Sequence, residues 1–514
     1  MLVKVFGAAV QGISATLITI EVNCSKGIKF MLVGLPDASV KESHERIVSA
    51  LQVNGYKFPR QQIIINMAPA DIRKEGSSYD LPLAIGILAA SGEINSDILT
   101  DYIIMGELSL DGTILPIKGV LPIAIKAREL GFKGIILPKQ NGKEAAVVNN
   151  LDVYAVDHIK EVIGFFNKEK ELTPVVVDTR AEFYKSQQTF EFDFSDVKGQ
   201  ENVKRALEVA AAGGHNVIMI GPPGAGKSMM AKRIPSILPP FTLNEALETT
   251  KIHSVAGKIS GDTSLMSQRP MRAPHHSISD IALVGGGMYP QPGEISLAHN
   301  GVLFLDELPE FSRNVLEVLR QPLEDRKICI SRAKFSVEYP SSFMLVSSMN
   351  PCPCGYYNHP EKECVCPNGA VQKYLNKISG PLLDRIDIQI EIVPVPFEKI
   401  SDKRLSESSD KIRERVIKAR ELQAKRFKDV DGIYCNAQMT SKQLAEYAAP
   451  SDEGLLLLKT AMDKFSLSAR AYDRILKVSR TIADLDNSDD VLPQHLAEAI
   501  NYRNLDRETW SNKI

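Results

Sequence analysis

The sequence predicts an α/β protein with a parallel sheet, and three observations support this fold class. Residues 1 to about 170 alternate strand-like and helix-like stretches, which is typical of a complete α/β domain. The apolar run Asn216 to Ile220 leads into a glycine-rich turn and then a helix start. The apolar run Val302 to Leu305 ends in two acidic residues, as expected of a buried parallel strand that delivers side chains to a site. A chain of 514 residues has room for about three domains.

The composition is that of an ordinary globular protein, with 44% hydrophobic and 24% charged residues. A net charge of −2 excludes a strong overall attraction to nucleic acid, so such binding would need local patches. The first seven residues lack the features of a signal peptide, and no apolar run approaches the roughly 20 residues that span a bilayer. Three of the seven cysteines are scattered and four are clustered, which fits a reducing compartment. We therefore expect a cytoplasmic protein without a membrane partner.

The first domain is expected over residues 1–172. Strand patterns occur at 15–22 and 62–67, and helical patterns at 40–53 and 81–90. The pattern then weakens, and we interpret 173–192 as an interdomain linker, with a structured edge strand as the alternative.

The glycine-rich turn has the residue types that a phosphate-binding loop requires. Glycines let successive N–H groups point at phosphate oxygens, Lys227 adds a positive charge, and the Ser228 hydroxyl can ligate Mg²⁺. A strand before the turn and a helix after it supply the required context, so a plain turn is the weaker alternative. The predicted nucleotide-binding residues are Gly221, Pro222, Pro223, Gly224, Ala225, Gly226, Lys227 and Ser228.

Two further strands bring polar side chains toward this loop. Asp306 follows one strand and is expected in the Mg²⁺ shell, while Glu307 can orient the attacking water. Asn350 follows the strand pattern at 342–349, and ligands of open α/β sheets gather beyond such strand ends. Without further context, Asn-Pro would also be consistent with a turn.

Four cysteines follow Asn350 in two C-x-C pairs separated by nine residues. Such a set can converge on a tetrahedral metal, and zinc is the usual ion. Reduced free thiols or an oxidisable pair are the alternatives. The candidate zinc ligands are Cys352, Cys354, Cys364 and Cys366.

Two segments with basic residues each allow two interpretations. The long insertion at 250–300 holds Arg272, His275 and His276, which could touch a polymer or lie on a solvated loop. Adjacent histidines point apart on a strand, so we do not expect zinc there. The basic helix expected at 411–427 is the best nucleic-acid patch by composition, although a solvated face is the usual meaning of such charges.

The first domain resembles the protease domain of the Lon family. The segment 74–81 is similar to the Lon segment that carries the nucleophilic serine, and Ser78 falls on that serine. The run from Gly106 to Ile117 resembles the strands before the Lon general base, but the position of that lysine is Leu121. Lys118 and Lys126 are nearby but do not align with the position of that lysine. The resemblance implies a Lon-protease-like (ribosomal S5 domain 2-like) α/β fold that has lost its peptidase, because serine needs a base to take its proton.

Residues 193–395 resemble the core of AAA+ P-loop ATPases, and 396–514 the basic helix and C-terminal helical lid. The resemblance implies that Asn350 senses the γ-phosphate or the attacking water. It implies that Arg385 reaches the γ-phosphate of a neighbouring subunit, with an intramolecular partner in Asp384 or Asp387 as the alternative. Arg470 matches the lid arginine that reads the γ-phosphate, and Arg474 is the second choice.

Two motifs, Asn350 to Gly355 and Arg272 to His276, resemble those of the ComM/YifB family of magnesium-chelatase-like AAA+ ATPases. The resemblance implies a hexameric ring that uses ATP and Mg²⁺ to move on branched or single-stranded DNA, driving branch migration during recombination of incoming DNA. An ATP-dependent Lon-like protease and a magnesium-chelatase motor subunit are the alternatives. Leu121 argues against the first, and the Lon-like domain has no evident use in the second.

Overall fold

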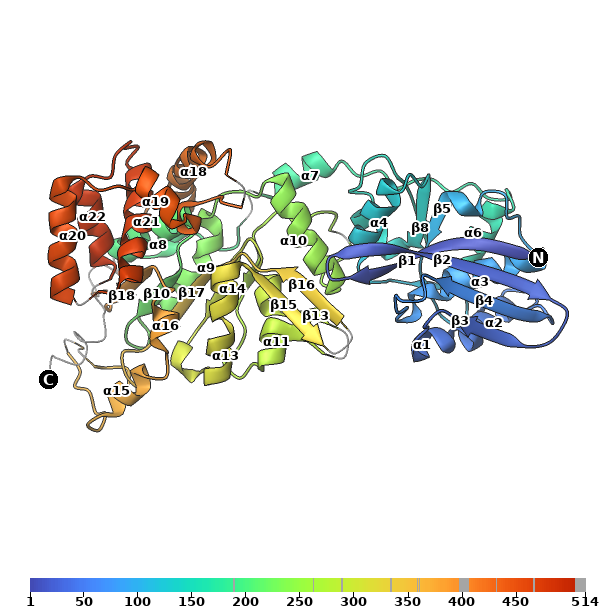
Figure 1. The fold of residues 1–514 in the computed structure, drawn as a ribbon, viewed down its shortest axis with the longest axis horizontal. Coiled ribbons are helices and arrows are strands. Elements are labelled where there is room, and N and C mark those ends of the chain that lie inside the picture. The colour runs from blue at the N-terminus through green and yellow to red at the C-terminus, as the bar shows by residue number, and fades with distance from the viewer. Residues whose placement is uncertain are drawn as a thin grey trace. The chain divides into compact units, whose positions relative to one another are not determined.

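The computed structural model describes residues 1–187, 190–261, 263–287, 290–332, 335–357, 359, 361–396, 406–430, 432–465 and 467–503. The chain forms two compact units, each built around its own sheet (Figure 1). Unit 1 contains Met1–Lys185, Leu243–Ser267 and Pro290–Pro292. Unit 2 contains Ser186–Thr242, Gln268–Tyr289 and Gly293–Ile514.

Unit 1 is built on a seven-stranded sheet with the order β3-β4-β2-β1-β5-β8-β9. Its strands are β1 (Leu2–Gln11), β2 (Ser14–Ser25), β3 (Phe30–Val33), β4 (Gln62–Ala68), β5 (Tyr102–Ile104), β8 (Gly134–Pro138) and β9 (Asp152–Val156). β1 and β4 pair antiparallel with β2, whereas the β3–β4, β1–β5, β5–β8 and β8–β9 pairs are parallel. The short strands β6 (Glu107–Leu108) and β7 (Ile114–Leu115) form a separate antiparallel pair.

The helices of unit 1 cover this sheet. They are α1 (Ala38–Lys41), α2 (Ser43–Val53), α3 (Asp80–Ser91), α4 (Val120–Glu129), α5 (Gly142–Ala145), α6 (Ile159–Phe166) and α10 (Leu243–Val255), with 3-10 turns at Ser77–Tyr79, Leu99–Asp101 and Lys139–Asn141. α3 is buried from Asp80 to Ala90 because it is apolar on every side. The strand patterns at 15–22 and 62–67 and the helical patterns at 40–53 and 81–90 are confirmed.

The segment that holds α10 belongs to unit 1, although the sequence favoured an insertion of the second domain beginning near residue 250. α10 packs on α4, where the Gly119 N–H donates to the Ser254 carbonyl at 3.0 Å. The Leu121 N–H donates to Ser254 Oγ at 3.4 Å. A helical pattern shows that a face is buried, but it does not show which unit buries it.

The expected linker at 173–192 contains ordered structure in its middle. α7 (Thr179–Ser186) crosses the boundary between the units, and Phe183 within it is buried. Val175 donates its N–H to the Val153 carbonyl at 2.8 Å. Two residues of the expected linker, Gln188 and Thr189, lie outside the described residues.

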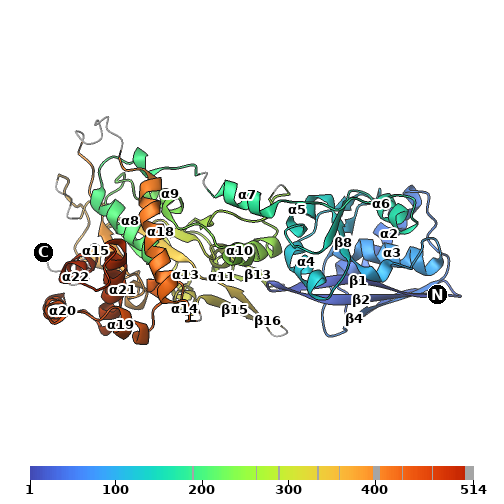
Figure 2. The ribbon, with the colours of Figure 1, turned by 90° about the horizontal axis from the view of Figure 1, so that it is seen from above.

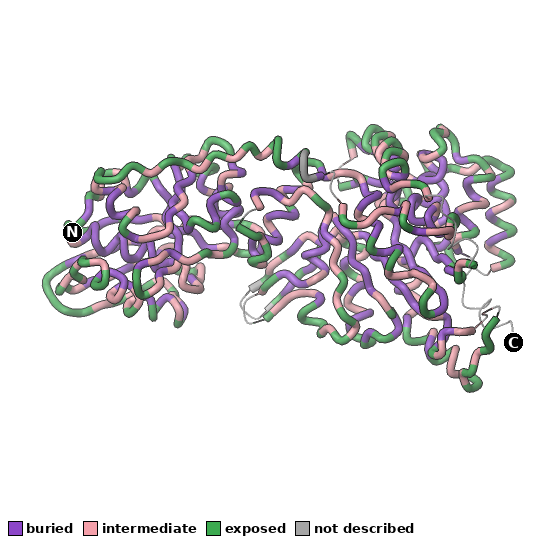
Figure 3. The backbone as a smooth tube through the Cα atoms, turned by 180° about the vertical axis from the view of Figure 1, so that it is seen from behind, coloured by how far each residue is buried: buried purple, intermediate pink, exposed green. Residues whose placement is uncertain are grey.

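Unit 2 has a five-stranded sheet with the order β11-β14-β17-β10-β18, and every neighbouring pair is parallel. The strands are β10 (Val217–Ile220), β11 (Met271–Arg272), β14 (Val302–Leu305), β17 (Met344–Met349) and β18 (Ile388–Glu391). Figure 3 shows the central strands buried along their length, because helices cover both faces of a parallel sheet.

The helices of the core part of unit 2 are α8 (Glu201–Gly213), α9 (Lys227–Ile237), α11 (Asp280–Val284), α12 (Glu294–Leu297), α13 (Arg313–Val318), α14 (Arg320–Asp325), α15 (Ala370–Leu375) and α16 (Gly380–Leu383). Shorter elements are a hairpin of β15 (Lys327–Arg332) and β16 (Phe335–Pro340), the strand β12 (Gly285–Gly286), and 3-10 turns at Phe194–Asp196, Leu308–Glu310 and Asn436–Gln438. The strand β13 (Gln291–Pro292) belongs to unit 1.

The C-terminal helices form the predicted lid and share one apolar core with the sheet of unit 2. They are α18 (Ser409–Arg426), α19 (Ser441–Tyr447), α20 (Asp452–Phe465), α21 (Ala469–Leu485) and α22 (Pro493–Asn501). α18 packs beside α8 (Figure 2). Residues 397–405 and 504–514 of the predicted lid region lie outside the described residues.

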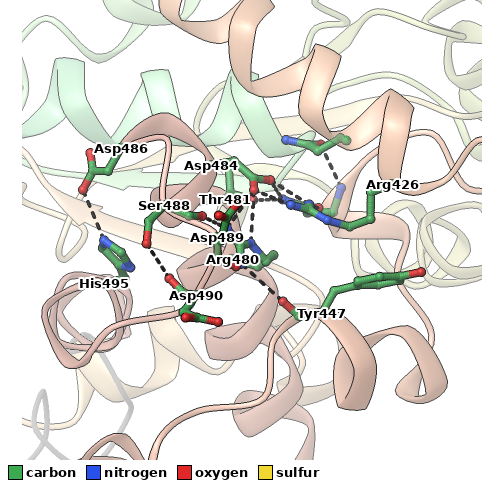
Figure 4. A network of polar contacts seen from close by, with 12 residues as sticks. Arg426, Tyr447, Arg480, Thr481, Asp484, Asp486, Ser488, Asp489, Asp490 and His495 are labelled. Atoms are coloured by element: carbon green, nitrogen blue, oxygen red, sulfur yellow. Dashed lines mark hydrogen bonds and ion pairs between the residues drawn. The ribbon is translucent and has the colours of Figure 1, made fainter.

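A buried polar network fastens α18 to α21 (Figure 4). The Arg426 guanidinium donates to both carboxylate oxygens of Asp484, at 2.9 and 2.6 Å, and Arg480 donates to the same carboxylate at 3.1 Å. Asn436 Nδ2 adds a bond of 2.8 Å to Asp484. Because the buried carboxylate is satisfied by several donors, this network holds the lid helices in one arrangement.

Candidate active site

The glycine-rich loop joins the buried strand β10 to the start of α9. Gly224 and Gly226 have φ angles of +78° and +88°, a left-handed conformation that side chains disfavour. Gly226 caps the helix, so the N–H groups of the first turn of α9 face the loop. A Cβ at Gly221 would overlap the Ile392 carbonyl oxygen. The loop therefore needs glycine for its backbone path as well as for its approach to β18.

Lys227 and Ser228, the first two residues of α9, reach the ends of two other strands. Lys227 Nζ donates to Asn350 Oδ1 at 3.0 Å and to the Gly221 and Pro222 carbonyls at 2.7 and 2.9 Å. Ser228 Oγ donates to Asp306 Oδ2 at 2.6 Å. Burial lowers the pKa of Lys227, an effect that nearby carboxylates oppose. The structure thus brings together the loop, Asp306 and Asn350, which the sequence proposed separately.

The two acids after β14 have different surroundings. Asp306 Oδ1 accepts hydrogen bonds from Ser348 Oγ and from the Glu307 N–H, so its carboxylate is fixed. Glu307 has φ +53° and ψ +50°, and 56% of its side chain is exposed. A left-handed backbone is unfavourable for glutamate and is often retained at functional sites. Ser348 was missed by the sequence reasoning, although its position on β17, two residues before Asn350, is a signal that could have found it.

The four cysteine side chains converge after β17. Their sulfur atoms lie within 4.8 Å of one another, with Cys352 Sγ at 3.3 Å from Cys354 Sγ and 3.7 Å from Cys364 Sγ. Sulfurs bound to one zinc at about 2.3 Å would be separated by about 3.8 Å, so the donor set fits this metal. Burial raises the pKa of the Cys352 thiol. None of the described cysteines forms a disulfide.

The cysteine cluster contacts the phosphate-binding loop through Gly355. This residue has φ +85°, and a Cβ there would overlap Pro223 Cδ. Tyr357 donates its N–H to Cys352 Sγ at 3.3 Å. The segment that carries the cysteines is therefore packed directly against one wall of the loop. The sequence placed the cluster near the nucleotide but did not indicate this contact.

Arg385 is held within its own chain. Its Nη2 pairs with Glu324 of α14, its Nη1 donates to the Pro381 carbonyl at 2.7 Å, and only 11% of the side chain is exposed. The intramolecular alternative named Asp384 or Asp387 as the partner, which is wrong in its detail. Because α14 lies some 60 positions before Arg385 in the sequence, local spacing could not identify Glu324.

The two lid arginines at the start of α21 differ in availability. Arg470 is 67% exposed and lies 3.9 Å from Asp384 Oδ2. Arg474 Nη1 donates to the buried Asp387 Oδ1 at 2.9 Å. Arg474 therefore ties the lid to the core, and Arg470 is the more exposed of the two.

The basic helix α18 does not present a positive surface. Its arginines bind other parts of unit 2: Arg413 the Leu238 carbonyl, Arg415 two glutamates, Arg420 the Ala211 carbonyl and Arg426 Asp484. The exposed positions alternate in sign, in the order Lys411, Glu414, Lys418, Glu421 and Lys425. The nucleic-acid patch suggested by composition is therefore not supported, because the acidic residues offset the exposed lysines.

The residues that match the Lon catalytic pair are not coupled. Ser78 lies in a 3-10 turn, and within the part of the chain that the structure describes its hydroxyl makes no hydrogen bond. Leu121 is buried, and its N–H donates to Glu144 Oε1 at 3.0 Å. Lys126 pairs with Glu129 at 3.2 Å. Lys74, a buried lysine that the sequence reasoning did not consider, donates Nζ to the Pro69 carbonyl.

Comparisons with known proteins agree with this architecture. Family models match residues 193–400 (Magnesium chelatase, subunit ChlI), 20–141 (Subunit ChlI of Mg-chelatase) and 406–503 (Magnesium chelatase, subunit ChlI C-terminal). Competence protein ComM of Haemophilus influenzae is 44% identical over 508 residues, 97% of each chain. The uncharacterized protein YifB of Escherichia coli is 44% identical over 505 residues, 97% of this chain and 96% of the relative.

Part of the chain is similar to a different class of protein. Lon protease 2 of Bacillus subtilis is 32% identical over 159 residues, which are 28% of this chain and 27% of the protease. In addition, no described helix is both long and apolar enough to cross a membrane. The chain therefore belongs to the ComM/YifB family of magnesium-chelatase-like proteins, with a Lon-protease-like α/β unit and an AAA+ unit that carries a helical lid.

Proposed function

We propose that this protein is an ATP-hydrolysing motor that acts on DNA. The observation that supports hydrolysis best is the convergence of Lys227, Ser228, Asp306 and Asn350 at the carboxyl ends of adjacent parallel strands, with the Ser228–Asp306 contact at 2.6 Å and the Lys227–Asn350 contact at 3.0 Å. Ligands of α/β sheets bind at such edges. Four groups that can each bind phosphate, Mg²⁺ or water lie in one place, which favours a nucleoside triphosphatase.

Each residue has a distinct task in this proposal. The N–H groups of the loop and Lys227 hold the phosphates of ATP. Ser228 and Asp306 offer the adjacent oxygens that Mg²⁺ prefers, and the ion when bound neutralises charge on the β- and γ-phosphates. Glu307 orients the attacking water, and Asn350 holds the γ-phosphate or that water. Arg470 reaches the nucleotide from the lid.

We further propose that the active form is a ring, with six subunits as in the family resemblance, and that Arg385 completes the site of the neighbouring subunit. The Arg385–Glu324 pair must then open on assembly. Since Glu324 is 63% exposed, water replaces the arginine at its carboxylate, while Arg385 also gives up its bond to the Pro381 carbonyl. An arginine supplied in this way accelerates related nucleotide hydrolases by about 10³ to 10⁵.

The DNA substrate is supported by the relative from Haemophilus influenzae, which is named a competence protein. We propose that the motor drives branch migration, as a helicase, on incoming DNA during natural transformation, in the cytoplasm. The family models favour a second candidate, a motor subunit of a magnesium chelatase, because their descriptions name that enzyme. Peptidase activity is disfavoured by the uncoupled Ser78 and Leu121.

We also propose that Cys352, Cys354, Cys364 and Cys366 hold a structural Zn²⁺. The support is the approach of four sulfurs to within 4.8 Å in a chain without described disulfides. Bound zinc would fix the loop between Asn350 and α15 in place, and no step of hydrolysis would pass through it.

The first experiment is ATP turnover with and without single-stranded and branched DNA. We expect DNA to stimulate the rate, and the rate per subunit to fall when dilution separates the ring. Glu307→Gln should bind ATP and assemble yet lose roughly 10² to 10⁴-fold in turnover, because it removes the group that activates water. Unchanged turnover with every DNA would exclude the motor-on-DNA function and leave the chelatase candidate. Wild-type turnover of Glu307→Gln would exclude the role of Glu307.

A further inference from the structure

The segment after β11 runs toward the two acids of the active site. β11 and β14 are parallel neighbours, with Met271 opposite Val302 and Arg272 opposite Leu303. Their carboxyl ends therefore lie at the same edge of the sheet, so the residues after Arg272 approach those after Leu305. Arg272 forms a two-bond ion pair with Glu294, at 2.6 and 2.8 Å, which fixes the end of β11. Its guanidinium is thus engaged within the chain.

The two histidines of this segment have different partners. His276 Nδ1 lies 3.7 Å from Glu307 Oε2. His275 Nδ1 instead lies 2.8 Å from Ser277 Oγ. The two rings are tilted by 36° with centroids 4.0 Å apart, and the His276 and Phe311 rings meet edge to face with centroids 6.4 Å apart. His276 therefore presents Nδ1 to Glu307, whereas the same nitrogen of His275 is engaged by Ser277.

Glu307 needs an external partner to keep one orientation. Its backbone is left-handed, and its side chain is 56% exposed. Among the described residues, His276 is the one whose side chain forms an ion pair or hydrogen bond with this carboxylate. An exposed glutamate samples several rotamers, and a misplaced group loses much of its catalytic effect.

We propose that His276 is a positioning residue for ATP hydrolysis, which holds the Glu307 carboxylate in the orientation that activates water. This inference rests on the proposed role of Glu307. It gives one histidine of the pair a task at the nucleotide, in place of the polymer contact or solvated loop considered from the sequence. The imidazole acts on the carboxylate across 3.7 Å, an ion-pair distance, and the proposal gives it no contact with the water.

The test compares His276→Ala, His276→Asn and His275→Ala by ATP turnover without DNA. We expect His276→Ala to lower kcat about 10-fold, the lower range for loss of a group that orients a functional side chain, with KM for ATP changed less than about twofold. We expect kcat to change more than KM because the variant leaves Lys227 and Ser228, which hold the phosphates, unchanged. His276→Asn restores a donor near the position of Nδ1 and should recover most of the rate. His275→Ala should stay within about twofold of wild type.

Three results would overturn the proposal: wild-type kcat in His276→Ala, equal losses in the two alanine variants, or a loss confined to KM. Adding His276→Ala to Glu307→Gln separates this proposal from the one on which it rests. If His276 acts through Glu307, the double variant is as slow as Glu307→Gln alone, whereas an additive loss contradicts it. If Glu307→Gln itself turns over normally, the role of Glu307 fails first.

Discussion

At the scale of single residues, Asp387 connects the core of unit 2 to the lid. It is fully buried before β18, where it accepts from Arg474 of α21 at 2.9 Å and from the Asn216 N–H at 3.0 Å, and it lies 3.5 Å from His215 Nδ1. Burial opposes its ionisation, but Arg474 and then His215 hold the pKa of Asp387 well below its usual range. Burial lowers the pKa of His215, although Asp387 opposes this.

We expect Asp387→Asn to destabilise unit 2 by up to about 3 kcal/mol, because it leaves Arg474, whose side chain is 23% exposed, without its charged partner. In the wild type the Asp387 contribution is complete above the unfolded pKa of about 3.9 and is lost as the pH falls below it. His215 acts in the same direction below about pH 6.5, since only the unfolded state takes up its proton there. Urea unfolding between pH 8 and pH 3, monitored by circular dichroism, measures the contributions of Asp387 and His215 to the free energy of unfolding.

Asp384→Asn is the matched control for this prediction. Asp384 lies three positions away, and its carboxylate contacts the exposed Arg470 at 3.9 Å, so loss of its charge should cost less than about 1 kcal/mol. The acid sensitivity should be shallower in Asp387→Asn than in the control. Equal free energies of unfolding for the two variants would show that the contacts of Asp387 do not stabilise the protein.

At the scale of elements, the four-cysteine loop and the phosphate-binding loop form one packed pair. Gly355 contacts Pro223, and Asn350, five residues earlier in the same segment, accepts a hydrogen bond from Lys227. The sequence of each loop indicates its own chemistry, a metal in one and phosphate in the other. Because the two loops touch, we expect the shape of the phosphate-binding loop to depend on whether the cysteine loop is held in place.

We expect replacement of the four cysteines by serine to remove one zinc per chain and to weaken ATP binding, because the released loop no longer supports Pro223 and Lys227. Gly355→Ala should weaken ATP binding with zinc still bound, since its Cβ would overlap Pro223 Cδ. Metal analysis and titration with a fluorescent ATP analogue measure the two effects. Each loss of affinity should be about 10-fold or more, the effect of about 1.4 kcal/mol.

Two controls separate this coupling from general damage. Gly369→Ala introduces the same strain, at φ +76°, but its Cβ meets nothing within 4 Å, so ATP affinity should be retained. Cys329→Ser changes an exposed cysteine on β15 outside the cluster and should keep both zinc and affinity. Serine variants of the cluster that lack zinc yet bind ATP normally would refute the coupling, and wild-type protein without zinc would refute the metal site.

At the scale of the whole molecule, the sequence predicts what is encoded locally. The phosphate-binding loop, the strand before Asp306 and the helical lid are recognisable because their residue types and spacing are contiguous. Contacts between residues far apart in the chain cannot be recognised in this way. The Arg385–Glu324 pair, the internal use of the α18 arginines and the unit to which α10 belongs depend on tertiary packing, which no local pattern specifies.

The assignment of α10 to unit 1 gives the last prediction. Ile252 of α10 and Ile234 of α9 are both completely buried, and their helices are consecutive in the sequence. Each change to alanine should cost about 2 to 5 kcal/mol, because it leaves a cavity in an apolar core. We expect Ile252→Ala to destabilise unit 1 and Ile234→Ala to destabilise unit 2. Hydrogen exchange of the full-length protein distinguishes the two effects, because compact units open separately. Peptides from β1 and β2 report on unit 1, and peptides from β10 and β17 report on unit 2. Faster exchange of β10 and β17 but not of β1–β2 in Ile252→Ala would place α10 with the nucleotide-binding core instead.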